Sequence, residues 1–118
     1  MKSKNYFKQK VLESLMYGLE GVKMVSKKHG IESIEDNDFL LRLVTTYLKN
    51  GEGIDIYITY KNKRLNIKNF NAPEPGFITL EAKNDNEFYA QVVEETAELL
   101  EKRQHMIESY RWFGPVED

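Results

Sequence analysis

The sequence predicts an α+β fold in a single domain covering residues 1–118. Two neighbouring segments alternate apolar and polar residues across a short turn, which predicts a β-hairpin. Longer segments on either side repeat apolar residues at steps of three and four, which predicts helices. A chain of 118 residues is enough for one buried core. The predicted order is ααβββα, a three-stranded antiparallel meander packed against helices.

The first predicted helix covers residues 4–28, and the basic residues in its last turn suit the helix dipole. Gly30 follows as the expected C-terminal cap. At about 1.5 Å per residue this helix is about 37 Å long, which is long for so small a domain. The predicted apolar face consists of Phe7, Val11, Leu12, Leu15, Gly18, Leu19, Val22 and Val25.

A second helix is predicted over FLLRLVTTYLKN, residues 39–50, with Asp36 or Asn37 as its N-cap. Its seven apolar residues cover more than half of a helix circumference, so we expect this helix to be largely buried. The Asn-Gly-Glu-Gly run at 50–53 ends it.

The hairpin is predicted over IDIYITYKNKRLNIKNF, residues 54–70. Strict alternation assigns one set of side chains to the core and the other to the outer face of the sheet. The expected core positions are Ile56, Ile58, Leu65 and Ile67. The expected outer positions include Tyr57, Thr59, Arg64, Asn66 and Lys68. A third strand is predicted from Phe77 to Ala82, after a loop rich in proline.

The last helix is predicted to begin at a cap formed by Asn84 or Asp85 and to run to about Trp112. Its outer face is acidic, and the EETAE run from Glu94 to Glu98 has the spacing at which helical carboxylates hold Mg²⁺. Such a site needs a second acidic helix, and three strands contradict an all-helical fold. The run is therefore interpreted as a solvated helix face.

Composition argues against catalysis, a metal site or a cofactor. The chain has no cysteine and only two histidines, which lie far apart at positions 29 and 105. It has no nucleophile elbow and no phosphate-binding glycine loop. No run of about 18 apolar residues is present, so we expect a cytoplasmic protein without a membrane span.

Two groups of residues are candidates for binding another protein chain. Tyr6, Tyr17 and Met24 lie on the first helix away from its main apolar face, and Tyr and Met are enriched at interfaces. Trp112 and Phe113 in the C-terminal segment either close the core or anchor a partner. Because the long first helix is apolar on two sides, we expect a homodimer with that helix at the interface.

The alternative is a nucleic-acid-binding regulator that uses the basic hairpin at 60–70 and the basic first helix. Its candidate contacts are Tyr57, Lys61, Lys63, Arg64 and Lys68. No recognition helix fits between the second helix and the hairpin, and residues 71–118 carry a net charge of −7. Lysines at a hairpin tip also keep a sheet edge soluble.

The favoured function is a small non-enzymatic binding protein that acts through protein–protein contacts. Size and composition suggest an accessory, inhibitor or immunity-type protein of a phage or other mobile element. The position of the positive charge separates the two hypotheses. If the first helix lies along the acidic last helix, their charges cancel and protein binding is favoured, whereas a basic face shared with the hairpin favours nucleic acid.

Overall fold

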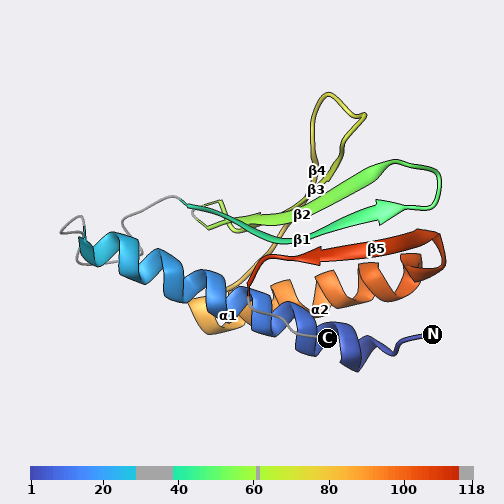
Figure 1. Ribbon diagram of the computed structural model, residues 1–118. Coiled ribbons are helices and arrows are strands. Elements are labelled where there is room, and N and C mark those ends of the chain that lie inside the picture. The colour runs from blue at the N-terminus through green and yellow to red at the C-terminus, as the bar shows by residue number, and fades with distance from the viewer. Residues whose placement is uncertain (29–38, 61, 115–118) are drawn as a thin grey trace.

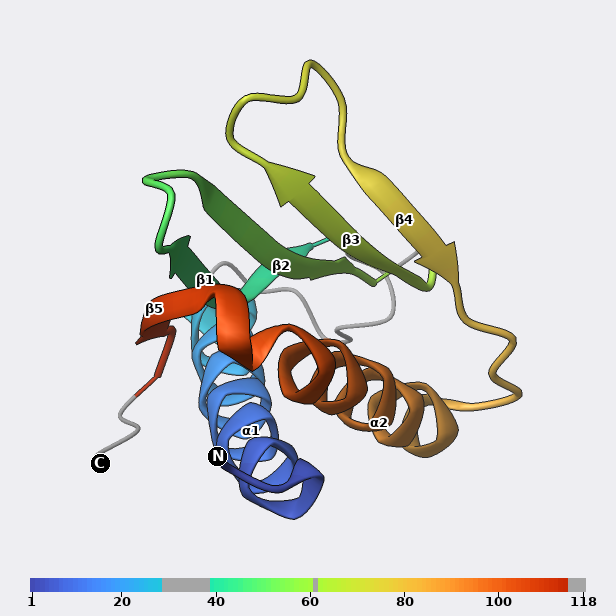
Figure 2. The same cartoon turned by 90° about the vertical axis from the view of Figure 1, so that its right-hand side faces the viewer.

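Two helices cover one face of a five-stranded antiparallel sheet (Figure 1). The structure is a computed structural model that describes residues 1–28, 39–60 and 62–114. Figure 2 shows both helices side by side on the same side of the sheet. The elements are α1 (Lys4–Lys28), β1 (Leu40–Leu48), β2 (Gly53–Thr59), β3 (Arg64–Asn69), β4 (Gly76–Thr79), α2 (Asp85–Arg103) and β5 (Ile107–Trp112). The strand order is β4-β3-β2-β1-β5.

The predicted α+β class is confirmed, with two helices and five strands in the described residues. Helix α1 has the predicted bounds, and its buried side chains contact α2 and β1. These side chains are Phe7, Val11, Leu15 and Leu19. Leu12 was predicted to widen this face, but it is 47% exposed. The predicted caps at Gly30 and at Asp36 or Asn37 lie outside the described residues.

The predicted second helix is wrong, because residues 40–48 form strand β1. This strand pairs with β2 on one side and with β5 on the other, and its residues from Leu43 to Thr46 are buried. A β-bulge between Arg42 and Val44 leaves two consecutive apolar residues, Leu43 and Val44, fully buried. The bulge breaks the period-two alternation, and the remaining apolar run resembles a buried helix. The Thr45-Thr46-Tyr47 run is the signal that favours a strand.

The predicted hairpin and meander are confirmed. Strand β2 pairs with β3 and β3 with β4, all antiparallel, with Ile56 opposite Ile67 and Ile58 opposite Leu65. Three of these four side chains are buried and Ile67 is half-buried. Strand β4 is shorter than the predicted third strand and ends at Thr79.

Asn66 departs from the predicted exposure. It lies on the outer face as expected but is 6% exposed. Its side-chain amide donates to the carbonyl of Tyr57 and the hydroxyl of Thr59, each at 3.4 Å. The outer face of the sheet is therefore polar and packed at this point.

Helix α2 begins as predicted, with Asn84 as its cap. The Asn84 side-chain oxygen accepts from the Glu87 amide at 2.9 Å, and the Glu87 carboxylate accepts from the Lys83 amide at 2.9 Å. This reciprocal arrangement satisfies two backbone donors at the start of the helix.

The predicted extension of this last helix to Trp112 is wrong. Helix α2 ends at Arg103, and a single 3-10 turn, Gln104–Met106, leads into β5. Ile107 and Tyr110 fit a helical spacing as well as a strand, so the sequence continues the helical pattern through the turn. In the structure Tyr110 and Trp112 lie on one side of β5, and their rings stack with centroids 5.9 Å apart.

We predict that Ile58→Ala lowers the free energy of unfolding by about 2–4 kcal/mol. Ile58 is fully buried between the sheet and the helices, and removing its side-chain atoms costs both transfer free energy and a cavity. Denaturant unfolding measures the change. Thr79→Ala on the exposed edge strand is the control and should change the value by less than about 0.5 kcal/mol. A loss below about 0.5 kcal/mol for Ile58→Ala would contradict its core position.

Candidate binding surfaces

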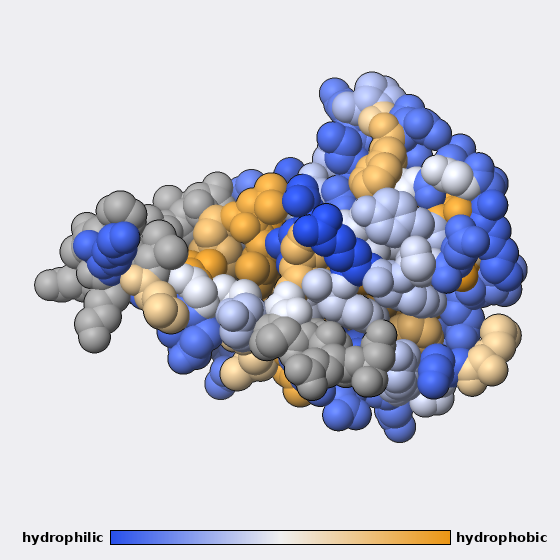
Figure 3. Space-filling model, viewed as in Figure 1, coloured by the Kyte–Doolittle hydropathy of each residue, from blue (hydrophilic) through white to orange (hydrophobic). Residues whose placement is uncertain are grey.

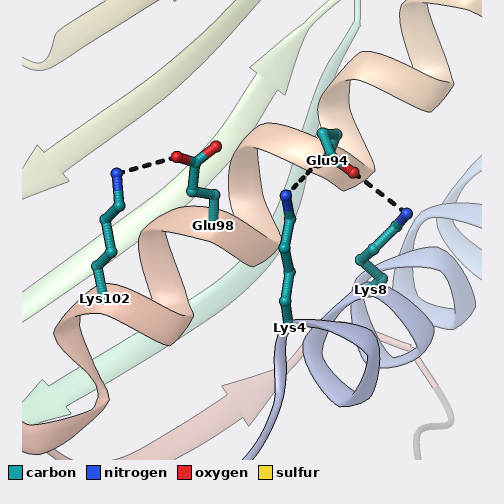
Figure 4. Close-up of polar contacts among 5 residues, drawn as sticks. All are labelled: Lys4, Lys8, Glu94, Glu98 and Lys102. Carbon is teal, nitrogen blue, oxygen red and sulfur yellow. Dashed lines mark hydrogen bonds and ion pairs between the residues drawn. The ribbon is translucent and has the colours of Figure 1, made fainter.

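Ion pairs join the basic start of α1 to the acidic face of α2 (Figure 4). The Lys4 ammonium donates to the Glu94 carboxylate, and the Lys8 ammonium lies 3.1 Å from the other Glu94 oxygen. Lys102 pairs with Glu98 at 2.9 Å along α2 itself. Two carboxylates of the EETAE run therefore hold lysines. Within the described part of the chain, no three His, Asp or Glu side chains are grouped to hold a metal ion.

These contacts shift the pKa values of the paired groups. The hydrogen bond from Lys4, followed by that from Lys8, lowers the pKa of Glu94 below its ordinary value of 4.5. The hydrogen bond to Glu94 raises the pKa of Lys4. Lys102 lowers the pKa of Glu98 in the same way. Positive charge at the start of α1 is thus partly neutralised by the Glu94 carboxylate of α2.

One residue from each of the two predicted partner-binding groups lies in a shared recess. Tyr6 of α1 and Trp112 of β5 line the same recess of about 520 Å³, together with Lys2, Lys10, Ser109 and Tyr110. Burial, with Tyr6 nearby, raises the pKa of Tyr110, so its hydroxyl remains neutral. An aromatic wall from β5 and a helix flank from α1 thus form one concave surface.

Further along α1, Tyr17 and Met24 are exposed, by 57% and 70%. The chain after β5 crosses α1 here, since a Cβ atom on Gly114 would lie 3.3 Å from the Tyr17 Cβ atom. The Ser14 hydroxyl lies 2.8 Å from the Leu43 carbonyl and 2.5 Å from the Phe113 carbonyl, and its single proton bonds to one of them. We call the surface formed by Tyr6, Tyr17, Met24, Tyr110 and Trp112 the α1 flank.

Phe113 lies apart from the α1 flank. Its ring centroid is 5.4 Å from the Arg42 guanidinium and 5.2 Å from the Arg111 guanidinium. Of the two predicted C-terminal anchors, Trp112 therefore contributes to the α1 flank, whereas Phe113 contacts arginines that project from the other side of the sheet.

That other side carries no described helix or strand, and we call it the open face (Figure 2). Residues directly opposite one another on paired strands share a face, so the register identifies its members. One row runs Arg111, Thr45, Asp55 and Lys68 across four strands. The next row runs Arg42, Tyr57, Asn66 and Phe77. A third row runs Leu40, Thr59, Arg64 and Thr79.

Three of the predicted nucleic-acid contacts, Tyr57, Arg64 and Lys68, lie together on the open face. Lys63 lies at the turn, where its ammonium donates to the Ala82 carbonyl at 3.2 Å. Lys61 lies outside the described residues. The Lys63 ammonium is therefore directed toward the chain that follows β4.

Sequence reasoning missed Arg42 and Arg111 as members of this surface. Both were assigned to helices, where their positions had no relation to the hairpin. The period-two spacing of Tyr110 and Trp112 was the available signal for β5, because it assigns Arg111 to the opposite face.

The two histidines were the other residues considered as metal ligands. His105 is exposed in the turn after α2, and His29 lies outside the described residues. No helix in the described ranges is long and apolar enough to cross a membrane.

No protein-family model matches the chain, and no match was found among curated proteins or among solved structures. The functional argument therefore depends on the surfaces described above.

We predict that Glu94→Gln destabilises the fold at neutral pH and that the difference disappears in acid. A carboxylate with a lowered pKa stabilises the folded state above its ordinary pKa of 4.5, and that contribution is lost as pH falls through the folded-state value. Thermal unfolding of both proteins between pH 7 and pH 3 measures this. Glu74→Gln, in the exposed loop before β4, is the control. Equal stability of Glu94→Gln and the wild type at pH 7 would show that the ion pairs contribute nothing measurable.

Proposed function

We propose that the protein acts by binding another protein chain, without catalysis, and that the α1 flank is the binding surface. The observation that supports this is the adjacency of two candidate groups distant in sequence. Tyr6 of α1 and the aromatic residues Tyr110 and Trp112 of β5 line one recess, and Tyr17 and Met24 are exposed further along the same helix. Concave surfaces with aromatic side chains are typical of interface anchors.

We propose a second copy of the chain as the partner on this surface. Strand β5 is at the edge of the sheet, where its outer backbone groups pair with no other described strand. Antiparallel pairing of β5 with its copy follows two-fold symmetry, so the same surface is used by both subunits. Such pairing continues the sheet and brings the two α1 flanks together. Tyr17 and Met24 then pack against the partner helix.

The charge distribution also favours protein binding, because the basic first helix lies along the acidic last helix. Helix α1 contacts the acidic α2, and Lys4 and Lys8 pair with Glu94 (Figure 4). These lysines are less available to phosphate groups.

We also propose that the protein is a cytoplasmic accessory, inhibitor or immunity-type protein of a phage or mobile element. Composition and size support this proposal.

We predict that the wild-type protein is a dimer at micromolar concentration and that Tyr17→Glu combined with Met24→Glu produces a monomer. Two carboxylates on the α1 flank would be buried without partners at the interface, which opposes association. Light scattering coupled to size-exclusion chromatography measures the mass.

Leu12→Glu combined with Met16→Glu is the matched control. Both residues are exposed on α1, by 47% and 57%. At about 100° per residue they lie on a different side of the helix from Tyr6, Tyr17 and Met24. The control should remain a dimer. A monomeric wild type would contradict the proposed assembly, and a dimer that survives the Tyr17 and Met24 substitutions would exclude the α1 flank.

A further inference from the structure

We propose that the open face of the sheet binds single-stranded nucleic acid. This proposal goes beyond the protein-binding function, because it concerns the opposite side of the sheet from the helices. It depends on three properties of the open face, which are its charge, its exposed rings and its polar centre.

The charge of the open face is predominantly positive. Arg42, Arg64, Lys68 and Arg111 project from three different strands, β1, β3 and β5. The carboxylate among them is Asp55, which accepts a hydrogen bond from Thr45 and lies 3.7 Å from the Arg42 guanidinium. Its side chain is only 14% exposed, so the cations dominate the accessible surface. Lys68 and Arg111 are three strand spacings apart, or about 14 Å, which lets the cations follow an extended phosphate backbone.

Exposed aromatic rings lie on the same face as these cations. Phe77, Phe70 and Tyr47 are exposed by 53%, 48% and 40%. The Arg64 guanidinium lies 4.1 Å from the centroid of Phe77, and the Phe70 ring fills the space beside Gly53 that a side chain would take. Exposed rings next to guanidinium groups are the arrangement on which unpaired bases stack.

The centre of the open face is polar, which argues for a polar ligand and against a protein partner. Thr45 and Asn66 are buried there, and Tyr57 lies between Arg42 and Asn66 on the neighbouring strands. A protein interface has an apolar core inside a polar rim. Here the order is reversed, since Tyr47 and Phe70 lie where β1 and β3 end and Phe77 lies on the edge strand β4. Figure 3 shows the corresponding mixture of hydrophobic and hydrophilic surface over the sheet.

A single strand fits this face better than a duplex. In a duplex the bases stack on each other, and their faces are unavailable to protein rings, whereas in a single strand they are free to stack on side chains. The exposed rings of the open face therefore select for unpaired nucleotides. The cations supply affinity without sequence preference.

Fluorescence anisotropy with labelled single-stranded DNA and RNA of about 16 nucleotides tests the proposal, since that is the upper end of the site size of a single OB fold that binds single strands. We expect binding at low salt that weakens as salt is added. For each phosphate contact, the logarithm of the binding constant should fall by about 0.7 per tenfold rise in salt concentration. The test variant is Arg64→Ala, Lys68→Ala and Arg111→Ala combined. It should bind at least about tenfold more weakly, with a salt slope smaller by about 2.

The matched control is Lys23→Ala, Lys28→Ala and Lys83→Ala combined, which removes the same charge from exposed positions away from the open face. It should keep the wild-type affinity. Phe77→Ala should weaken binding by about fivefold or more with an unchanged salt slope, because it removes stacking and leaves the charge. Circular dichroism and thermal unfolding establish that each variant is folded.

Four results would overturn the proposal. They are no binding of the wild type at low salt, equal losses in the two triple variants, binding of duplex as tight as binding of a single strand, and binding of polyglutamate in place of the oligonucleotides. The last result would assign the face to an acidic protein. The dimer test uses other residues, so either proposal can fail while the other stands.

Discussion

The fold depends on one constraint, which is that both described helices cover the five-stranded sheet from the same side. Every strand must therefore carry an apolar side toward the helices and a polar side away from them. Ile56, Ile58 and Leu65 meet this requirement in the middle of the sheet, where Phe88 and Leu15 of the two helices belong to the same core. Because α1 and α2 share that face, they also lie against each other. The ion pairs of Lys4 and Lys8 with Glu94 follow from this placement.

The uneven charge of the sequence separates into two parts once the elements are placed. Charge at the start of α1 is balanced by α2 across the helix contact. Charge on the strands faces no helix or strand among the described residues, so Arg64, Lys68 and Arg111 remain on the open face. Asp55 is the exception, and its contacts with Thr45 and Arg42 keep its carboxylate largely covered. A chain with a net charge of −2 thus presents a basic surface in one place.

The sequence predicted well where one periodicity was unbroken. The alternation around Ile56 and Leu65 determined the register of the hairpin, and the spacing from Phe7 to Leu19 determined the buried side of α1. Prediction failed at residues 40–48 because the bulge before Val44 buries two consecutive residues. It failed at residues 107–112 because Ile107 and Tyr110 fit both periods. The candidate surfaces could be predicted only as fragments, since the pairing of β1 with β5 brings their residues together through long-range contacts.

The same pairing links the two surfaces physically. Strand β5 contributes Trp112 to the α1 flank and Arg111 to the open face, so alternate residues of one strand belong to different surfaces. The Ser14 hydroxyl and the Phe113 amide, which donates to the Leu43 carbonyl at 3.2 Å, hold the end of this strand between α1 and β1. A partner that displaces β5 therefore moves residues on both sides of the sheet. Linkage makes any such effect reciprocal, so a dimer that binds nucleic acid more tightly must itself be strengthened by nucleic acid to the same degree.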